Sequence, residues 1–253
     1  MTELQMTAPF SIRMQEKSAP FLSPTTTELA QDQEERDELI TYGKRDAAGK
    51  LFKISHNRLP LFESADAIFP GNTAPIIRNA SDGERELVNQ SWGFVLVMDG
   101  KAPRRVTNVR DDKIRSSSFW RGSFEERRCL VPVSSFSEPK GLKPAVWHWF
   151  TVNGDDPRPL FAFAGIWRSY KGPLKKDGPE VEIDVFAFMT TNPNQLVSTI
   201  NHERMPVILT EEKDFEQWLN GTPREAYELV KQYPSEKMRI VQAGSDKKDL
   251  LAA

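Results

Sequence analysis

The segment Asn201 to Leu209, with the sequence Asn-His-Glu-Arg-Met-Pro-Val-Ile-Leu, places an imidazole, a cation and a proline close together. It follows a run typical of a strand, Asp184 to Thr190, so these groups would lie near the end of that strand. The imidazole of His202 titrates near neutral pH and can move protons in catalysis. We therefore predict a functional site here, although a lone histidine is more often a core or surface group.

A second candidate group is the carboxylate of Glu138, which follows the apolar run Cys129 to Phe136. The end of an apolar strand is a poor place for a carboxylate unless the group is exposed, ion-paired or raised in pKa. On its own, this position favours a structural or solvated glutamate.

Composition bounds the kinds of site that this chain can form. Its 253 residues, 38% of them hydrophobic, can bury a full core. A single cysteine excludes an internal disulfide and a multi-cysteine zinc site, and from three scattered histidines we expect neither a metal nor a cofactor. No run is long enough to span a bilayer, and Met1 to Ser23 lacks the apolar core of a secretory signal. We expect a cytoplasmic monomer without a membrane partner.

Charge is unevenly distributed along the chain. The net charge of −2 gives no hint of a nucleic-acid partner. Residues 1–40 carry eight acids against three bases, whereas residues 101–128 carry nine bases against four acids. On charge alone a solvated face explains the basic segment, residues 101–128, better than a binding surface does. The alternative is contact with phosphates.

Short runs rich in β-branched and aromatic residues, separated by Gly, Pro and Asn, predict a largely antiparallel sheet or barrel. Residues 1–23 show no periodicity and are expected to be irregular or mobile. The expected strands cover residues 51–54, 74–78, 91–98, 129–136, 145–152, 160–167, 181–189, 205–209 and 238–242. The expected helices cover residues 28–42, 118–127, 194–200, 211–219 and 222–231, and residues 171–179 form an exposed hairpin loop.

Four segments also match one family pattern in order. Asn108-Val109-Arg110 corresponds to an N-A-R triplet, Arg128 to Glu138 to an R-C-L-I-P-A-D-G-F-Y-E strand, Phe163 to Trp167 to an F-A-G-L-W strand, and His202 to Leu209 to an H-x-R-M-P-V-I-L signature. Together they resemble the SOS response-associated peptidase (SRAP) family, whose members form a covalent bond to abasic sites in single-stranded DNA. The resemblance is strongest over residues 60–245. It implies an α+β fold in a single domain, residues 1–253, with a curved, largely antiparallel or barrel-like sheet and peripheral helices.

The resemblance also implies roles for individual residues. Glu138 matches a glutamate that assists proton transfer at the nucleophile, and His202 suits ring opening and Schiff-base chemistry on an aldehyde sugar. Asn108, Arg110 and Arg204 match positions that grip the DNA backbone near the lesion, and such phosphate contacts give affinity without sequence preference. Thr191 matches a position whose hydroxyl holds a phosphate or His202, although a threonine at a strand end is commonly a cap.

The departures from the family fall on the covalent step. The family nucleophile is a cysteine directly after the initiator methionine, and Thr2 occupies that position. The α-amine of Thr2 would have a pKa near 7.7–8.0 and could form a reversible imine with an abasic aldehyde, but a disordered terminal residue is the simpler interpretation. Asp66 to Pro70 keeps only the proline of the family's Tyr-Asn-x-Ala-Pro turn, and Met98 to Thr107 replaces a segment that bears tryptophan.

Three functions follow from these observations. The first is a DNA-damage-response enzyme of the SOS type that acts on abasic sites in single-stranded DNA, with the peptidase or hydrolase activity that the family name implies. The second is a non-covalent module that binds single-stranded DNA through backbone contacts and stacking. The third is an interaction protein that keeps the fold without binding DNA.

Overall fold

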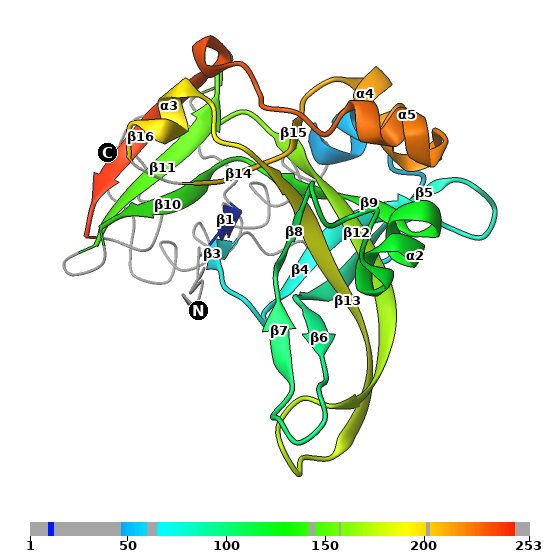
Figure 1. Cartoon of the computed structure of the whole chain (residues 1–253). Coiled ribbons are helices and arrows are strands. Elements are labelled where there is room, and N and C mark those ends of the chain that lie inside the picture. Colours follow the sequence, from blue (N-terminus) through cyan, green and yellow to red (C-terminus); the bar gives the residue numbers. More distant parts are fainter. Residues whose placement is uncertain are drawn as a thin grey trace, which may run out of the picture.

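The core of the fold is a sheet that closes on itself. Its strands are β4 (Thr73–Asn79), β5 (Arg85–Trp92), β9 (Arg128–Val133), β12 (Phe161–Pro173) and β13 (Glu180–Thr191). In the computed structural model, which describes residues 10–12, 47–59, 65–141, 145–156, 158–200 and 203–245, they pair in the order β13-β12-β9-β4-β5. A parallel pairing between β5 and β13 completes the ring (Figure 1). The expected α+β fold with a barrel-like sheet is therefore confirmed.

Two hydrophobic clusters lie on the two faces of this sheet, because successive residues of a strand point to opposite sides. Along β12, Phe161 and Phe163 belong to one cluster, whereas Ala162 and Ala164 belong to the other. Both faces of the strand are thus buried over residues 161–166, which explains the continuous apolar sequence of this half of the strand.

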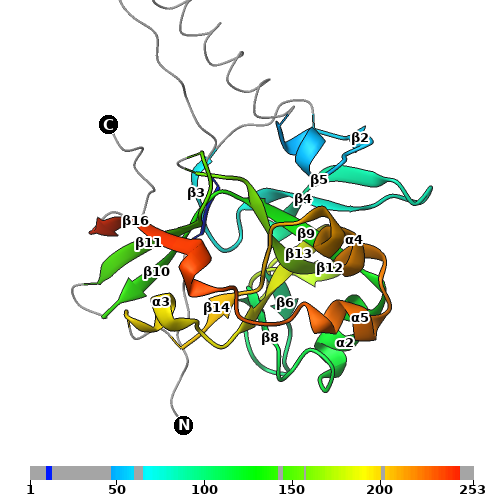
Figure 2. The same cartoon turned by 90° about the horizontal axis from the view of Figure 1, so that it is seen from above.

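Helices cover the face that carries the alanines. From α4 (Glu212–Asn220), Phe215 and Trp218 enter that cluster at helical spacing. The start of α5 (Pro223–Glu228) is fixed by a capping box, in which Thr222 and Glu225 each bond to the other's backbone. The three helices α2 (Ser118–Glu126), α4 (Glu212–Asn220) and α5 (Pro223–Glu228) lie together at one side of the barrel (Figures 1 and 2).

A smaller antiparallel sheet packs beside the barrel. Its strands are β10 (Phe136–Lys140), β11 (Val146–Val152) and β16 (Met238–Gly244), in the order β10-β11-β16. Phe136 and Phe150 stack with ring centroids 5.3 Å apart, and both belong to the cluster that contains Phe163. The two sheets therefore share one core.

Short elements complete the described chain. A two-stranded pair joins β1 (Phe10–Ile12) to β3 (Ala65–Ile68), and β6 (Phe94–Leu96) pairs with β7 (Arg104–Val106). The remaining elements are β2 (His56–Asn57), β8 (Asn108–Arg110), α3 (Gln195–Ser198), β14 (Met205–Pro206), β15 (Ile208–Leu209) and the 3-10 turn η1 (Ser235–Lys237). Among the helices of the described ranges, none has both the length and the apolar character needed to cross a membrane.

The structure corrects three of the expected strands. Residues 51–54 form no strand, because residue 51 ends a helical turn. The expected strand over residues 91–98 is broken at Gly93, whose φ of 108° places it in the left-handed region. The expected strand over residues 129–136 ends at Val133, and a second strand begins at Phe136. The expected helix over residues 28–42 lies outside the described residues, and the division into one domain stays a prediction.

Candidate functional site

The end of β13 gathers side chains from three separate segments. Strand β8 runs parallel to β13, with Asn108 opposite Phe188 and Arg110 opposite Thr190. Strand β14 pairs with β13 on the antiparallel pattern, with Met205 opposite Thr191. Arg204 directly precedes β14. Four of the residues predicted from the sequence, Asn108, Arg110, Thr191 and Arg204, are thereby brought to one end of one strand.

Asp111 links two of these residues. Its carboxylate accepts a hydrogen bond from the Thr191 hydroxyl at 2.8 Å and one from Nη2 of Arg204 at 2.6 Å. Arg204 also donates from Nη1 to the side chain of Asn192 at 3.0 Å and from Nη2 to the carbonyl oxygen of Thr190 at 2.5 Å. Because Arg204 is only 5% exposed, its guanidinium braces the strand end rather than extending into solvent.

Arg110 is oriented differently. Its guanidinium forms a two-pronged ion pair with Asp112, with Nε 3.0 Å from Oδ1 and Nη2 3.2 Å from Oδ2. The pair is exposed, with 41% of the arginine side chain and 48% of the aspartate side chain open to solvent. The hydrogen bond from Arg110 lowers the pKa of Asp112 below its ordinary value, and the same bond raises the pKa of Arg110. Of the two arginines, Arg110 is therefore the one that an incoming anion can reach.

Asn108 contributes an amide to the same strand end. Its Oδ1 atom is buried and accepts no hydrogen bond from the described part of the chain. A buried carbonyl without a donor is unfavourable, and such groups are candidates for contact with a ligand.

Glu138 lies on β10, in the smaller sheet. It is in the middle of a strand instead of at its end, because the break at residues 134–135 starts a new strand before it. The side chain is 3% exposed, and burial raises the pKa of its carboxyl well above the ordinary value. A glutamate whose pKa is raised holds its proton to higher pH than an ordinary glutamate does, which is the property that a general acid requires.

Aromatic contacts connect Glu138's strand to the end of β13. The ring of Phe136 is 5.7 Å from that of Phe163, which is 5.0 Å from that of Phe188. Phe188 in turn lies opposite Asn108 in the parallel pairing with β8. In both views β14 lies between β10 and β8 (Figures 1 and 2). Glu138 and the β13 residues therefore belong to neighbouring parts of one packed unit.

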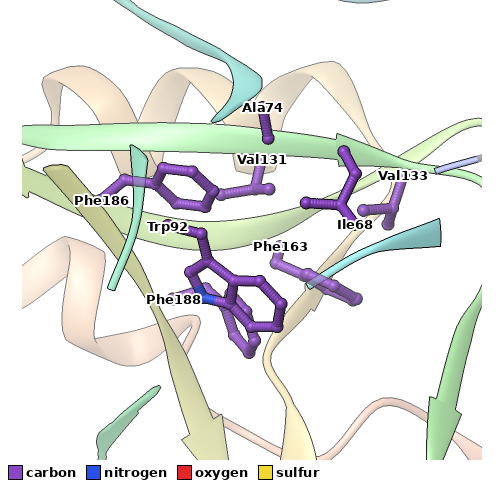
Figure 3. A pocket seen from close by; sticks show the side chains of 8 residues that line it. All are labelled: Ile68, Ala74, Trp92, Val131, Val133, Phe163, Phe186 and Phe188. Atoms are coloured by element: carbon purple, nitrogen blue, oxygen red, sulfur yellow. The ribbon is translucent and has the colours of Figure 1, made fainter. Parts of the chain in front are cut away.

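The aromatic core contains a small apolar pocket of about 10 Å³. Figure 3 shows the rings of Trp92 and Phe188 near each other, with centroids 5.6 Å apart. Trp92 is 1% exposed, and its indole N–H donates to the carbonyl oxygen of Thr107. It is a core residue, not a stacking platform for bases. The lining residues are Ile68, Ala74, Trp92, Val131, Val133, Phe163, Phe186 and Phe188.

The basic segment, residues 101–128, is only partly available to a ligand. Arg105 donates to the carbonyl oxygens of Trp92 and Gly93. Arg128 is 9% exposed and donates to carbonyl oxygens at the ends of α2 and α4, among them those of Phe124 and Leu219. Burial lowers the pKa of both arginines. Two of the nine bases therefore stabilise the fold, which the charge count alone could not show.

Cys129, the one cysteine of the sequence, is fully buried in the core. Burial raises the pKa of its thiol far above the ordinary value, so a thiolate is not formed near neutral pH. It is therefore a small buried hydrophobic residue of the core. Thr2 and His202 lie outside the described residues, and their roles stay predictions. Within the described ranges, no group of three or more His, Cys, Asp or Glu side chains is placed to hold a metal ion.

Solved structures share this fold. A protein from Bordetella bronchiseptica superposes with a TM-score of 0.60 at 21% identity, covering 78% of this chain and 95% of that one. A protein from Bacteroides thetaiotaomicron gives a TM-score of 0.54 at 26% identity, covering 70% and 77%. The chain is thus an α+β protein of a class with known representatives.

The family follows from the sequence comparison. The model of the SOS response associated peptidase (SRAP) family matches residues 9–246, and the chain belongs to that family. The Bacillus subtilis protein named abasic site processing protein YoqW is 30% identical over 183 residues, covering 69% of this chain and 78% of the relative. The Gallus gallus protein named abasic site processing protein HMCES is 26% identical over 194 residues, covering 64% and 56%.

Sequence reasoning missed Asp111. It stands directly after the Asn-x-Arg triplet, but only the pairing of β8 with β13 brings its carboxylate to Thr191 and Arg204. An acid beside a cluster of bases was the one available signal, and that signal does not identify a partner so distant in sequence.

Proposed function

We propose that this chain recognises abasic sites in single-stranded DNA with the residues gathered at the end of β13, and that it forms no stable sulfur-dependent crosslink. Membership of the SRAP family and the names of its relatives support the substrate. The burial of Cys129, the single thiol of the sequence, supports the second part. The observation that carries the proposal is the assembly of Asn108, Arg110 and Thr191 on one strand end.

Arg110 supplies the principal phosphate contact in this proposal. Its guanidinium is exposed and already holds a planar carboxylate in two-pronged geometry, which is the geometry that a phosphate also accepts. Contacts to phosphate carry no base sequence, as a lesion-binding protein requires. Buried Arg204 stabilises the strand end that carries the other residues. Asn108 offers its amide to the sugar or to the DNA backbone.

Glu138 is the proposed proton donor for opening the abasic sugar ring. The ring form of the lesion is a hemiacetal, and its opening to the aldehyde requires proton transfer to and from oxygen. His202 is the proposed second acid or base. If the α-amine of Thr2 then attacks the aldehyde carbon, a C=N bond replaces C=O, the oxygen leaves as water, and the resulting imine is reversible.

The first experiment measures binding to an abasic single strand and to the undamaged strand over a range of salt concentrations. Each phosphate contact contributes about 0.7 to the salt slope for single strands. Arg110→Ala should therefore weaken binding and lower the slope by about that amount. Lys176→Ala is the matched control, because Lys176 is an exposed cation in the turn at the opposite end of β13 from Thr191. An equal loss in both variants would argue against a specific contact by Arg110.

The second experiment separates the chemical alternatives. Incubation with abasic single strands followed by heating should leave no adduct, whereas borohydride added during incubation should trap an imine, and peptide mapping should locate the amine. Binding without a trapped adduct would indicate that the protein is a non-covalent DNA-binding module. Absence of binding at low salt would favour an interaction protein and contradict the proposal.

A further inference from the structure

The two carboxylate oxygens of Asp111 accept hydrogen bonds from different groups. Oδ2 accepts the hydrogen bond from Oγ1 of Thr191 at 2.8 Å. Oδ1 accepts two hydrogen bonds, one from Nη2 of Arg204 at 2.6 Å and one from the backbone N–H of Asp112 at 2.9 Å. Thr191 and Arg204 are 4% and 5% exposed, so these bonds form in a largely dehydrated environment.

This arrangement fixes the polarity of the Thr191 hydroxyl. A hydroxyl carries one proton and two lone pairs. Because the proton is donated to Asp111, only lone pairs are left for any other partner of Oγ1. We infer that Asp111 is a positioning residue that makes Thr191 a hydrogen-bond acceptor in the lesion site, so that the site selects a ligand with an O–H donor at this point. The inference rests on the proposed function.

An abasic sugar offers such a donor and the ordinary backbone does not. Loss of the base leaves a hydroxyl on C1′, where an intact nucleotide carries the base. Phosphodiester oxygens are acceptors only, so Thr191 cannot hold a phosphate while its proton stays on Asp111. The inference is incompatible with one of the two roles expected for Thr191 from the sequence, contact with a phosphate. A site built to accept from a hydroxyl discriminates against an analogue that lacks it.

The same geometry predicts that replacement of one oxygen of Asp111 by nitrogen reverses the preference of Thr191 for a hydrogen-bond donor. In Asp111→Asn, the oxygen must remain at the Oδ1 position, because two donors, from Arg204 and Asp112, point at it. The amide nitrogen then replaces Oδ2 and donates to Oγ1 of Thr191. The hydroxyl proton is released and can be donated outward, so Thr191 becomes a donor.

The test compares two single strands that cannot form an imine. One carries a borohydride-reduced abasic site, which is ring-opened and has hydroxyls on C1′ and C4′, and the other carries the closed tetrahydrofuran analogue, which has neither. The unmodified protein should bind the reduced site about five- to tenfold more tightly, as expected for one hydrogen bond to a largely buried group. Thr191→Val should bind both strands equally, and Asp111→Asn should lose or invert the preference.

Asp112→Asn is the matched control, because it removes the same charge one residue away without touching Thr191. Asp112→Asn should keep the preference for the reduced site. Asp111→Glu, which keeps a carboxylate at this position, should retain part of the preference that Asp111→Asn loses. Thermal unfolding of each variant reports whether the fold is retained. Equal affinity of the unmodified protein for the two strands, or an unchanged preference in Asp111→Asn, would overturn the inference while leaving the proposed function intact. Binding of neither strand would instead refute the proposed function.

Discussion

Arg110 and Asp112 form an ion pair with each other at the point where the proposed function requires Arg110 to bind a phosphate. The two-pronged pair, at 3.0 and 3.2 Å, matches the geometry of an arginine with a phosphate. Asp112 therefore competes with DNA for the same guanidinium. A phosphate that binds Arg110 must first displace a carboxylate of the protein itself.

Removal of this competitor should strengthen DNA binding. An exposed ion pair contributes up to about 1 kcal/mol, so Asp112→Asn should raise affinity for abasic single strands by up to about fivefold at low salt. Titration of a labelled oligonucleotide measures the change. Asp177→Asn is the control, because Asp177 is an exposed acid in the distant hairpin turn and asparagine accepts its φ of 57°. An increase of the same size in the control would indicate a general charge effect.

Glu138 should make stability depend on pH. Burial raises its folded-state pKa above the unfolded value, so the native state holds the proton more tightly. The stability that the protonated carboxyl gives is fully present below the unfolded-state pKa and is lost as pH rises through the folded-state pKa. Glu138→Gln should remove this loss. The variant should therefore gain about 1.4 kcal/mol in the free energy of unfolding for each unit by which the folded-state pKa exceeds the unfolded-state pKa.

Thermal unfolding from about pH 5 to about pH 8 measures this effect as a stabilisation of Glu138→Gln that grows with pH. Glu182→Gln, the same change at an exposed position of β13, is the control. A pH-independent difference for Glu138→Gln would mean that the carboxyl ionises normally in the folded protein.

Arg128 should matter for stability and not for DNA binding. Arg128→Met removes hydrogen bonds to the carbonyl oxygens of Phe124, Glu125, Trp218, Leu219 and Gly221. Leaving these helix-end groups without a donor should lower the free energy of unfolding by about 2–4 kcal/mol. Denaturant unfolding measures the loss. Arg127→Met, at a half-buried neighbour paired with exposed Glu126, should change stability by at most about 1 kcal/mol. Comparable losses in the two variants would contradict the assigned role.

The Cys129 thiol should be inert in the native protein. Its burial and raised pKa predict no reaction with a thiol reagent until the chain unfolds, when one thiol per chain should react. Cys129→Ser should leave the yield of borohydride-trapped DNA adduct unchanged. A heat-stable adduct that disappears in this variant would show that the cysteine reaches the lesion.

Several elements could be predicted because their signals are local. Thr222, Pro223 and Glu225 mark the start of a helix by capping chemistry alone, and α5 begins there. The break between β9 and β10 has no such signal, since Ser134 and Ser135 are tolerated within strands as well as between them. It is the pairing of β10 with β11 that ends one strand and begins the next.

The members of the site could be predicted only in part for the same reason. Family motifs pointed to Asn108, Arg110, Thr191 and Arg204, and the structure places them together. Motifs could not show that Arg204 is buried while Arg110 is exposed, or that a neighbouring aspartate neutralises each of them. Those properties arise from contacts between segments far apart in the chain.

The pairing of β13 with several other strands determines how the site would open locally. Strand β13 pairs with β12 and β5 before its end, and its end pairs with β8 and β14, two segments that are far apart in the chain. Local opening of that end would release Asn108, Arg110 and Thr191 at the same moment. Amide hydrogens of β8, β14 and the end of β13 should therefore exchange as one cooperative group, and recognition should vanish in a single step.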